Sequence, residues 1–347
     1  MTGESTGAPE HQVRISSLLQ QVHVLNHYQA RIGDDFLSAD TLFYETKPGE
    51  PAIVLPLHQT LYEKFYCRLE LPESHRPSSE FPSKPPGPTE FLELLRSANS
   101  GREMSRSEWK LFSLTSNGQA FVTNGETVHV AEPGDFSLRQ LQNAETPEID
   151  YVMFRTERTS RETGFYFGMG ETPADAIDRT LVSRLYFNLA PDAALEWFRL
   201  VTKTFNRAQL PYTMKCPLNP EAFKRSDSCV LYVPRRYLSS VLIVVHPILR
   251  QLRDQLRPTT PMFTRPIVPG VGFADDPGTG ESFGQHRMRL VARALCFAQQ
   301  AGTITFEQKW ECVVKEFSAN ELLLDRPYLA PNAPDFDDVD FAEDVVQ

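Results

Sequence analysis

The sequence predicts an α+β fold, and three patterns along the chain support that prediction. Apolar residues recur at helical spacing in residues 15–25 and again in residues 57–68. Residues 111–135 change to short β-type runs with two Asn-Gly pairs, which favour hairpin turns. From residue 164 onwards, short strand-like runs alternate with helix-like segments. We therefore expect an N-terminal helical and β-meander portion followed by an α+β portion.

The first portion is expected to form a peptide-binding domain over residues 13–150, after a flexible N-terminus at 1–12. The apolar side chains of residues 57–68 recur every four residues, which is typical of a helix face packed on a core. Residues 71–88 contain six prolines and cannot form a regular element, so we expect a loop or linker there. The β-meander follows that loop.

The second portion is expected to form a domain over residues 151–325, followed by an acidic tail at 326–347. Pro191 suits the first turn of a helix, and Pro247 is expected to kink the helix that contains it. The expected elements are a strand at 164–168, a helix started by Thr172 and Pro173, a strand at 184–189, a helix from Pro191, strands at 212–215 and 229–233, a helix at 235–256 and a helix capped by Ser282.

Composition limits the kinds of partner that this protein can have. With 347 residues, 41% hydrophobic and 23% charged, the chain resembles a folded soluble protein. The net charge of -10 argues against a general nucleic-acid binder. The five cysteines include no C-x-x-C pair and predict reduced structural thiols. The chain shows neither a signal peptide nor a membrane-spanning run, so we expect a cytoplasmic protein that does not bind membranes.

Positive charge gathers in one stretch of this acidic chain. Strand alternation places Arg184, Tyr186 and Asn188 on one face, opposite apolar neighbours. The same alternation directs Lys215 to the polar side of a short strand that we expect close to residues 184–189. Four more basic residues follow: Lys224, Arg225, Arg235 and Arg236. Such a group is also common on a solvated surface, and a lone strand lysine is more often exposed than catalytic.

A glycine-rich segment at 269–287 leads into the helix capped by Ser282, which would carry His286 and Arg287. Backbone N–H groups at a helix N-terminus favour an anion, and phosphate suits such a site. The segment contains neither a P-loop nor a dinucleotide-binding motif. The glycines are equally compatible with a simple surface loop, His286 with a packing role, and the pair Asp275 and Asp276 with turn chemistry rather than a metal.

Three stretches resemble a known family. RLYFNLAPDAALEWFRLVTKTFNRAQLPYTMKCP, RSDSCVLYVPRRY and FTRPIVPGVGFADDPGTGESFGQHR are similar to the HopA-type effector family, as found in the lyase component of class V lanthipeptide and thioamitide biosynthesis. The likeness spans roughly residues 15–325. It implies a phosphothreonine-lyase-like fold in the second portion and a reaction without a cofactor or metal. It also implies two partners: a leader-bearing precursor peptide and a separate kinase-like protein that phosphorylates its Ser or Thr.

The family in turn resembles the phosphothreonine lyases of enteric pathogens, which implies roles for individual residues. The base position falls on Lys215, and phosphate-binding positions fall on Arg225, Arg235 and Arg287. Arg184 and Lys224 join them as phosphate-binding candidates because they belong to the same basic stretch. The position of the catalytic histidine is occupied by Asn188. The general acid is therefore open among His286, Tyr186 and Tyr232, or phosphate leaves as the anion without one.

The implied function is β-elimination of phosphate from phosphorylated Ser or Thr, which leaves dehydroalanine or dehydrobutyrine. A lysine that is buried near arginines has a lowered pKa and can act as a neutral base, while arginines stabilise the phosphate that departs. The alternative is a non-catalytic component that binds the peptide or the kinase. A nucleotide-dependent kinase is disfavoured because phosphate-loop and kinase motifs are missing.

Overall fold

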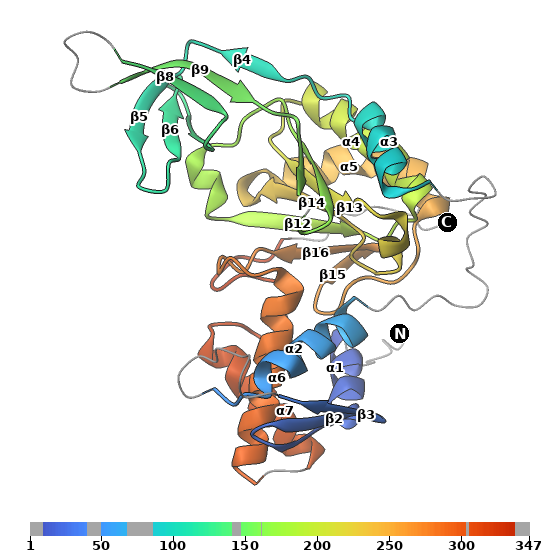
Figure 1. The fold of residues 1–347 in the computed structure, drawn as a ribbon. Coiled ribbons are helices and arrows are strands. Elements are labelled where there is room, and N and C mark those ends of the chain that lie inside the picture. The colour runs from blue at the N-terminus through green and yellow to red at the C-terminus, as the bar shows by residue number, and fades with distance from the viewer. Residues whose placement is uncertain are drawn as a thin grey trace, which may run out of the picture. The chain divides into compact units, whose positions relative to one another are not determined.

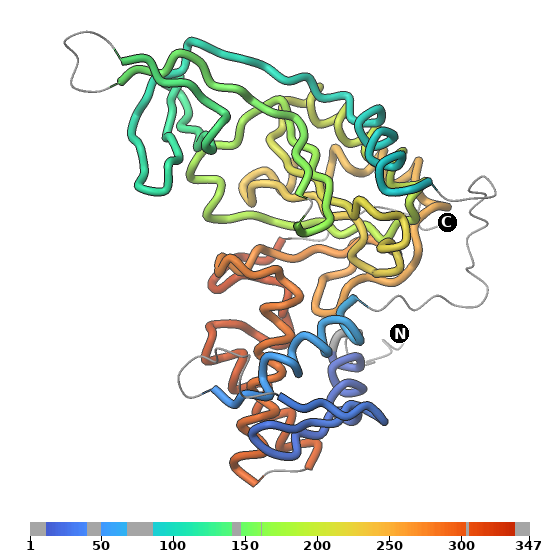
Figure 2. Tube along the Cα trace, in the orientation of Figure 1, coloured from blue at the N-terminus to red at the C-terminus, as the bar shows by residue number. Residues whose placement is uncertain are grey.

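The computed structural model describes residues 10–39, 50–67, 86–140, 147–160, 162–302 and 305–336. Contacts divide the chain into two compact units (Figures 1 and 2). Unit 1 takes residues 1–70, 259–267 and 272–338, and unit 2 takes 71–258 with 268–271 and 339–347. This differs from the expected boundary near residue 150. The reason is that the N-terminal segment packs on helices near the C-terminus, a pairing that no local pattern reveals.

Unit 1 contains both the first and the last described segments of the chain. Its N-terminal part contains α1 (Glu10–Gln21), β1 (Val22–Asn26), β2 (Gln29–Ile32), β3 (Asp35–Ser38), α2 (Val54–Leu61) and the π-helical turn η1 (Tyr62–Tyr66). Its C-terminal part contains α6 (Phe283–Gln300) and α7 (Phe306–Ala319), and most residues of β15 (Arg265–Val268) and β16 (Val271–Asp275) also belong to unit 1. Helices α2 and α6 pack together, and Gly284 of α6 leaves room for the Tyr66 ring.

The expected helix at 15–25 is wrong in its second half. The helix ends at Gln21, and Val22 begins β1, which pairs antiparallel with β2 in the sheet β1-β2-β3. The β-branched residues Val22 and Val24 suit a strand, and Val22 is completely buried within unit 1. The helix expected at 57–68 is present as α2 with η1, which together end at Tyr66.

Unit 2 begins with α3 (Pro88–Ala98) and the predicted β-meander. The meander is a sheet of β5 (Lys110–Leu114), β6 (Ala120–Thr123) and β7 (Val128–Ala131), beside a second sheet of β4 (Met104–Arg106), β9 (Glu148–Phe154) and β8 (Phe136–Arg139). Both predicted Asn-Gly turns are confirmed, because Gly118 and Gly125 have positive φ between paired strands. A core around Trp109, Val122 and Val152 lies in this region.

The remaining strands of unit 2 form the platform for the site. Strands β10 (Glu157–Ser160), β11 (Phe165–Met169), β13 (Thr213–Pro217), β14 (Cys229–Pro234) and β12 (Val182–Phe187) are hydrogen-bonded in that order, all antiparallel. One face packs on α4 (Pro191–Arg207) and α5 (Leu238–Leu252), as Figure 1 shows. That face buries Tyr166, Met214, Leu185 and Leu231 completely.

Most expected elements of this half are present, with shifted ends. The helix expected from Thr172 is wrong: only a 3-10 turn, η3 (Ala176–Arg179), forms there, capped by the Asp175 side chain. The helix expected at 235–256 is α5, flanked by the 3-10 turns η5 (Arg235–Tyr237) and η6 (Arg253–Gln255), with Pro247 inside it. The further 3-10 turn η4 (Pro220–Phe223) follows β13, and Ser282 caps α6 as predicted.

The ends of the chain were only partly predicted. Helix α1 starts inside the N-terminal segment that was expected to be flexible. Part of the predicted acidic tail is folded, because Tyr328 and Leu329 are buried and Asp335 pairs with Arg265. Residues 1–9 and 337–347, and 71–85 of the predicted proline-rich loop, lie outside the described residues. Within the described helices, none is both long and apolar enough to span a membrane.

Candidate functional site

Strand pairing brings four of the residues singled out in the sequence, Arg184, Tyr186, Lys215 and Tyr232, onto one face of the five-stranded platform. Lys215 lies opposite Val230, Thr213 lies opposite Tyr232, and Tyr232 in turn lies opposite Arg184. The alternation predicted for Arg184 and Tyr186, and for Lys215, is therefore confirmed. Strand β14 separates β12 from β13, so the two predicted strands are second neighbours in the sheet.

Lys215 lies half-buried on that face. Its Nζ is 3.7 Å from the centroid of the Phe165 ring, which covers the ammonium group from one side. The pKa of Lys215 is lowered to about 8, mainly by burial; the charge of Asp227 raises this pKa, and the charges of Arg225 and Arg184 lower it. Loss of hydration penalises the charged form of a lysine, and nearby cations add to that penalty. The predicted lowering of this pKa is thus confirmed, with burial as its main cause.

Arg225 and Asp227 form a close pair beside Lys215. The Nη2 of Arg225 donates to Oδ2 of Asp227 at 2.8 Å, and its Nε donates to Oδ1 of the same carboxylate. The Asp227 side chain is only 9% exposed, whereas that of Arg225 is 24% exposed. This bidentate contact fixes the plane of the guanidinium group. The guanidinium group of Arg225 is therefore held in a defined orientation.

Arg184 and Tyr232 form the second contact on this face. The guanidinium carbon of Arg184 lies 5.3 Å from the centroid of the Tyr232 ring, within the range of a cation–π contact. Arg184 is only 7% exposed, so its charged group lies almost entirely below the protein surface. Tyr232 is half-buried at the edge of the cavity described below. Lys215, Arg184, Arg225 and Tyr232 are the predicted residues that the structure brings together.

Asn188 does not join them as an accessible group. It follows the last residue of β12 and is completely buried. Its backbone N–H donates to the carbonyl oxygen of Gly270 at 2.9 Å, and its own carbonyl accepts from the N–H of Arg257 at 2.9 Å. A side chain without exposed surface cannot contact a substrate in this conformation. The catalytic role predicted for Asn188 is therefore replaced by one in packing.

Arg287 and His286 belong to unit 1, whereas the platform strands belong to unit 2. Arg287 is completely buried, and its Nε and Nη2 donate to the carbonyl oxygens of Pro327 and Leu329 at 2.7 and 2.9 Å. Its Nη1 lies 2.7 Å from Nδ1 of His286. These contacts hold the C-terminal segment, so we withdraw Arg287 as a phosphate ligand. They also engage the imidazole of His286, which favours a packing role for it.

Two further predicted phosphate ligands lie away from Lys215. The Lys224 side chain is 80% exposed and pairs with Glu221 at 2.7 Å. Arg235 follows Pro234, which is four residues beyond the partner of Lys215 in β14, or roughly 13 Å along a strand. The proximity of these residues in sequence suggested one cluster, but the strand carries Arg235 to the opposite end of the sheet.

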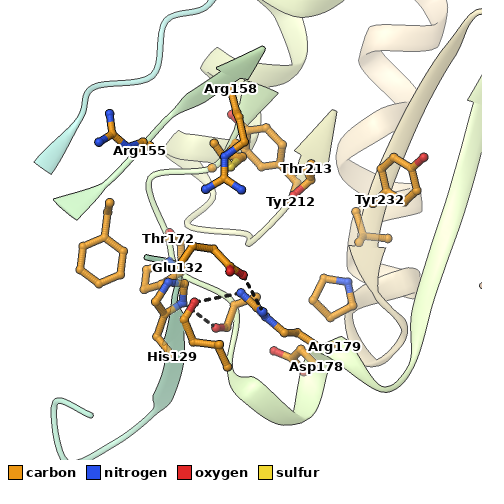
Figure 3. Close-up of a pocket in the computed structure, with 18 of the residues that line it drawn as sticks. His129, Glu132, Arg155, Arg158, Thr172, Asp178, Arg179, Tyr212, Thr213 and Tyr232 are labelled. Carbon is orange, nitrogen blue, oxygen red and sulfur yellow. Dashed lines mark hydrogen bonds and ion pairs between the residues drawn. The ribbon is translucent and has the colours of Figure 1, made fainter. Parts of the chain in front are cut away.

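A cavity of about 260 Å³ lies over the same platform, beside Thr213 and Tyr232 (Figure 3). Its lining residues come from β7, β9 and η3 and from the platform strands of unit 2. The charged lining residues are Glu132, Asp135, Arg155, Arg158, Asp178 and Arg179. In Figure 3 the guanidinium of Arg158 points toward the other lining side chains, and Arg179 forms an ion pair with Glu132.

Sequence reasoning missed Asp227, Phe165 and the arginines of this cavity. Asp227 could have been noticed as the acidic residue two positions after Arg225. Arg155 and Arg158 carried no signal of their own, since isolated arginines around a strand are usually surface residues. Among the described residues, no group of three or more His, Cys, Asp or Glu side chains is arranged to hold a metal. Asp276 accepts a hydrogen bond from the N–H of Gly278, as predicted turn chemistry requires, whereas Asp275 accepts a long-range hydrogen bond from the N–H of Ala330.

The fold and this face define an α+β protein with a half-buried lysine and arginines on an antiparallel platform. The model of the HopA1 effector protein family matches residues 156–329, which is half of the chain. The chain therefore belongs to the HopA1 effector protein family. The match includes the platform strands with Lys215, and it confirms the family resemblance and the α+β class.

Solved structures similar to this chain include two effector proteins of Pseudomonas syringae. The effector from pathovar tomato strain DC3000 is 13% identical, with a TM-score of 0.46, and the match covers 80% of this chain and 90% of that one. The effector from pathovar syringae strain 61 is 12% identical, with a TM-score of 0.44, and the match covers 80% of this chain and 98% of that one. No curated protein matches the chain.

Proposed function

We propose that this protein is a carbon–oxygen lyase that eliminates phosphate from phosphorylated Ser or Thr in a peptide. The observation that carries the proposal is Lys215, a half-buried lysine with a pKa of about 8 beside Arg184 and Arg225. A lysine on a strand is held more rigidly than one on a loop, and near neutral pH a useful fraction of it is uncharged. This is the chemistry that removal of a proton from Cα needs.

In the proposed step, Nζ of neutral Lys215 takes the proton from Cα of the phosphorylated residue. The electrons of that C–H bond form the double bond between Cα and Cβ. The bond between Cβ and Oγ breaks, and phosphate leaves with its electron pair. The products are dehydroalanine or dehydrobutyrine, inorganic phosphate and a protonated Lys215, which returns its proton to solvent.

The phosphate is proposed to lie between Arg225 and Arg184. Both guanidinium groups are close enough to act on the Lys215 charge, so an anion bound there would also be close to Nζ. Charge-assisted hydrogen bonds from arginine stabilise a departing phosphate. Arg225 is the more exposed of the two and is already oriented by Asp227, so we assign it the direct contact.

Tyr232 is the proposed general acid, chosen because it lies on the same face as Lys215 and contacts Arg184. Tyr186 is an alternative on this face, since it lies opposite Val230, the residue that also faces Lys215. Tyr186 is only 3% exposed, so Tyr232 is better placed to reach a leaving oxygen. A phosphate that leaves as the monoanion would need neither residue.

The family resemblance supplies the proposed context, which is biosynthesis of a ribosomal peptide natural product. A kinase-like protein would phosphorylate the leader-bearing precursor in the cytoplasm, and this protein would then eliminate the phosphate. No nucleic acid, membrane, metal or cofactor takes part in the proposed scheme.

The direct test incubates the purified protein with phosphoserine and phosphothreonine forms of the precursor peptide and follows loss of phosphoric acid by mass spectrometry. We expect Lys215→Ala to lower the rate by about 10²- to 10⁴-fold, the usual contribution of a general base. Lys203→Ala is the control, because Lys203 is an exposed lysine on α4. Unchanged phosphopeptide with the folded wild-type protein and its kinase present would rule the proposal out.

The alternative is a component that binds the phosphopeptide or the kinase without catalysis. Complete burial of Asn188, at the position where the resemblance implies a catalytic histidine, favours this alternative. It predicts that the protein binds phosphopeptide more tightly than the unphosphorylated peptide while leaving the phosphate in place. Titration calorimetry together with the mass-spectrometric assay separates the two.

A further inference from the structure

The cavity beside Tyr232 lies in register with the proposed base. In the platform, Arg158 of β10 lies opposite Phe167, and Phe167 lies opposite Lys215. Arg158 and Lys215 therefore occupy one row across the sheet and point to the same face, with β11 between them. The neighbouring row contains Met169, Thr213 and Tyr232, which line the cavity.

The cavity is close enough to Lys215 to accept a neighbouring residue of the same peptide. Thr213 lines the cavity and is two residues from Lys215 on β13, which is roughly 7 Å along a strand. An extended peptide advances about 3.3 to 3.6 Å per residue. A peptide whose reacting Cα is at Lys215 would therefore place a side chain within about three residues of it in the cavity.

The cavity lining contains three arginines and three carboxylates, but one of the carboxylates serves two of the arginines. Arg155 and Arg158 share the single carboxylate of Asp135, through Nε and Nη2 respectively. Arg179 pairs with Glu132, and Asp178 pairs with Arg236, which lies outside the lining. Positive charge is therefore in excess around Asp135, where two guanidinium groups share one carboxylate, although the lining as a whole is balanced. Burial lowers the pKa of His129, so this lining imidazole adds no positive charge near neutral pH.

Arg158 is the arginine best suited to meet an incoming anion. Its side chain is 49% exposed, whereas the Asp135 carboxylate that orients it is 13% exposed. A guanidinium has five N–H donors, and the contact of Arg158 with Asp135 at 3.1 Å is made through Nη2. Apolar walls at Met153, Met169 and Val182 would contact the methylene groups of a side chain that ends in a carboxylate.

We infer that this cavity is a specificity subsite that binds an acidic side chain, Glu or Asp, of the substrate peptide within about three residues of the phosphorylated one. The inference rests on the proposed function only for the position of the reacting residue. Arg158 is its specificity-determining residue, and the Asp135 carboxylate orients that guanidinium.

The test uses phosphopeptides that carry a single Glu at each position from three before to three after the phosphorylated residue, each paired with a Gln version. For the wild-type full-length protein we expect one or two positions at which Glu raises kcat/KM over Gln by roughly five- to fiftyfold, as for a charge-assisted contact. In Arg158→Gln this preference should fall to about onefold, while the kcat for the Gln peptide stays near that of the wild type.

Arg139→Gln is the matched control, since Arg139 is an exposed arginine of unit 2 that pairs with Glu148 and does not line the cavity. It should keep the full preference for Glu. Equal kcat/KM for Glu and Gln at every position in the wild type would overturn the inference while leaving the lyase proposal intact. If phosphate is not eliminated, fluorescence anisotropy tests the inference instead, by comparing the dissociation constants of the Glu and Gln peptides. A Glu preference that requires Arg158 supports the subsite, and equal dissociation constants overturn it.

Discussion

Lys215 owes its chemistry to the surroundings of one amino group. An exposed lysine is almost fully charged near neutral pH and is a poor base. On β13 the ammonium group has lost part of its hydration and lies over the Phe165 ring, and the raising effect of Asp227 on its pKa opposes the lowering effects of two nearby arginines. A strand lysine is common in protein sequences. What distinguishes this one is burial, which depends on residues from three other strands and a loop.

The pH dependence of elimination should report this lysine. Because the reactive form is neutral, we expect kcat/KM to rise about tenfold per pH unit below pH 8 and to level off above it, as the pKa of about 8 requires. The measurement is an initial-rate series between about pH 6 and 10, with peptide phosphate already ionised over most of that range. A profile that is flat across pH 8 would show that another group is the base.

The same pKa makes a prediction about stability. The pKa of Lys215 is about 8 in the folded protein and near the ordinary lysine value of 10.5 when unfolded. Burial of the charged Lys215 therefore lowers the free energy of unfolding by its full amount below pH 8, where the folded and unfolded states are both protonated. This destabilisation disappears as pH rises toward 10.5. We expect Lys215→Met to raise the free energy of unfolding at pH 7 by on the order of 1 to 2 kcal/mol.

Urea unfolding of both proteins at pH 7 and at about pH 10.5 measures this effect. The advantage of Lys215→Met should shrink at the higher pH. An advantage of equal size at both values would mean that better packing of Met, rather than the buried charge, stabilises the variant.

At the scale of elements, the end of β12 is fixed by a turn that tolerates only glycine. Gly270 has φ of +80°, and a Cβ there would lie 2.4 Å from the carbonyl oxygen of Arg257. Its N–H donates to the carbonyl of Pro258, and its carbonyl accepts from Asn188 at the end of β12. These backbone contacts position the last residue of a strand that carries Arg184.

Gly270→Ala should therefore destabilise the protein by about 2 to 4 kcal/mol, through a backbone clash added to an unfavourable φ. Gly278→Ala provides the comparison, because Gly278 also has positive φ but a Cβ there would meet nothing within 4 Å. Its cost should be about 1 kcal/mol. Thermal unfolding of the two variants measures the difference, and equal losses would show that φ alone matters at Gly270.

At the scale of the whole molecule, unit 1 depends on contacts between distant parts of the chain. Lys309 of α7 donates to the carbonyl oxygens of Leu19 and Val22 at 3.1 and 2.8 Å, which ties α7 to the end of α1. Arg287 of α6 similarly holds the carbonyls of Pro327 and Leu329. Two basic side chains, Arg287 completely buried and Lys309 partly buried, thus connect distant segments of unit 1, a role that their sequence positions did not reveal.

Arg287→Met should cost about 2 to 4 kcal/mol, because it leaves two buried carbonyl groups without their donor. Arg289→Met on the same helix should cost at most about 1 kcal/mol, since Arg289 makes a partly exposed ion pair with Glu281. Thermal unfolding and amide hydrogen exchange in residues 322–336 measure both. Loss of phosphate elimination without loss of stability in Arg287→Met would return Arg287 to the phosphate site.

The sequence by itself determined the local elements and the face on which each strand residue lies. Its alternation and turn residues predicted the two hairpins, most strands of the platform and the polar side of Lys215, because these depend on neighbours within a few residues. It also carried the family resemblance. The end of the first helix and β1 were missed, because the apolar spacing of residues 15–25 fits a helix whereas Val22 and Val24 pair with β2.

Only the tertiary structure decided which basic residues meet. Arg225, Arg235 and Arg287 look equivalent in the sequence, but pairing in the platform places Arg225 beside Lys215, carries Arg235 along β14 and leaves Arg287 buried on carbonyl groups of unit 1. The same pairing brings Arg158 into the row of Lys215. Burial and charge proximity are properties of the whole packed chain, and for that reason the site became visible only with the fold.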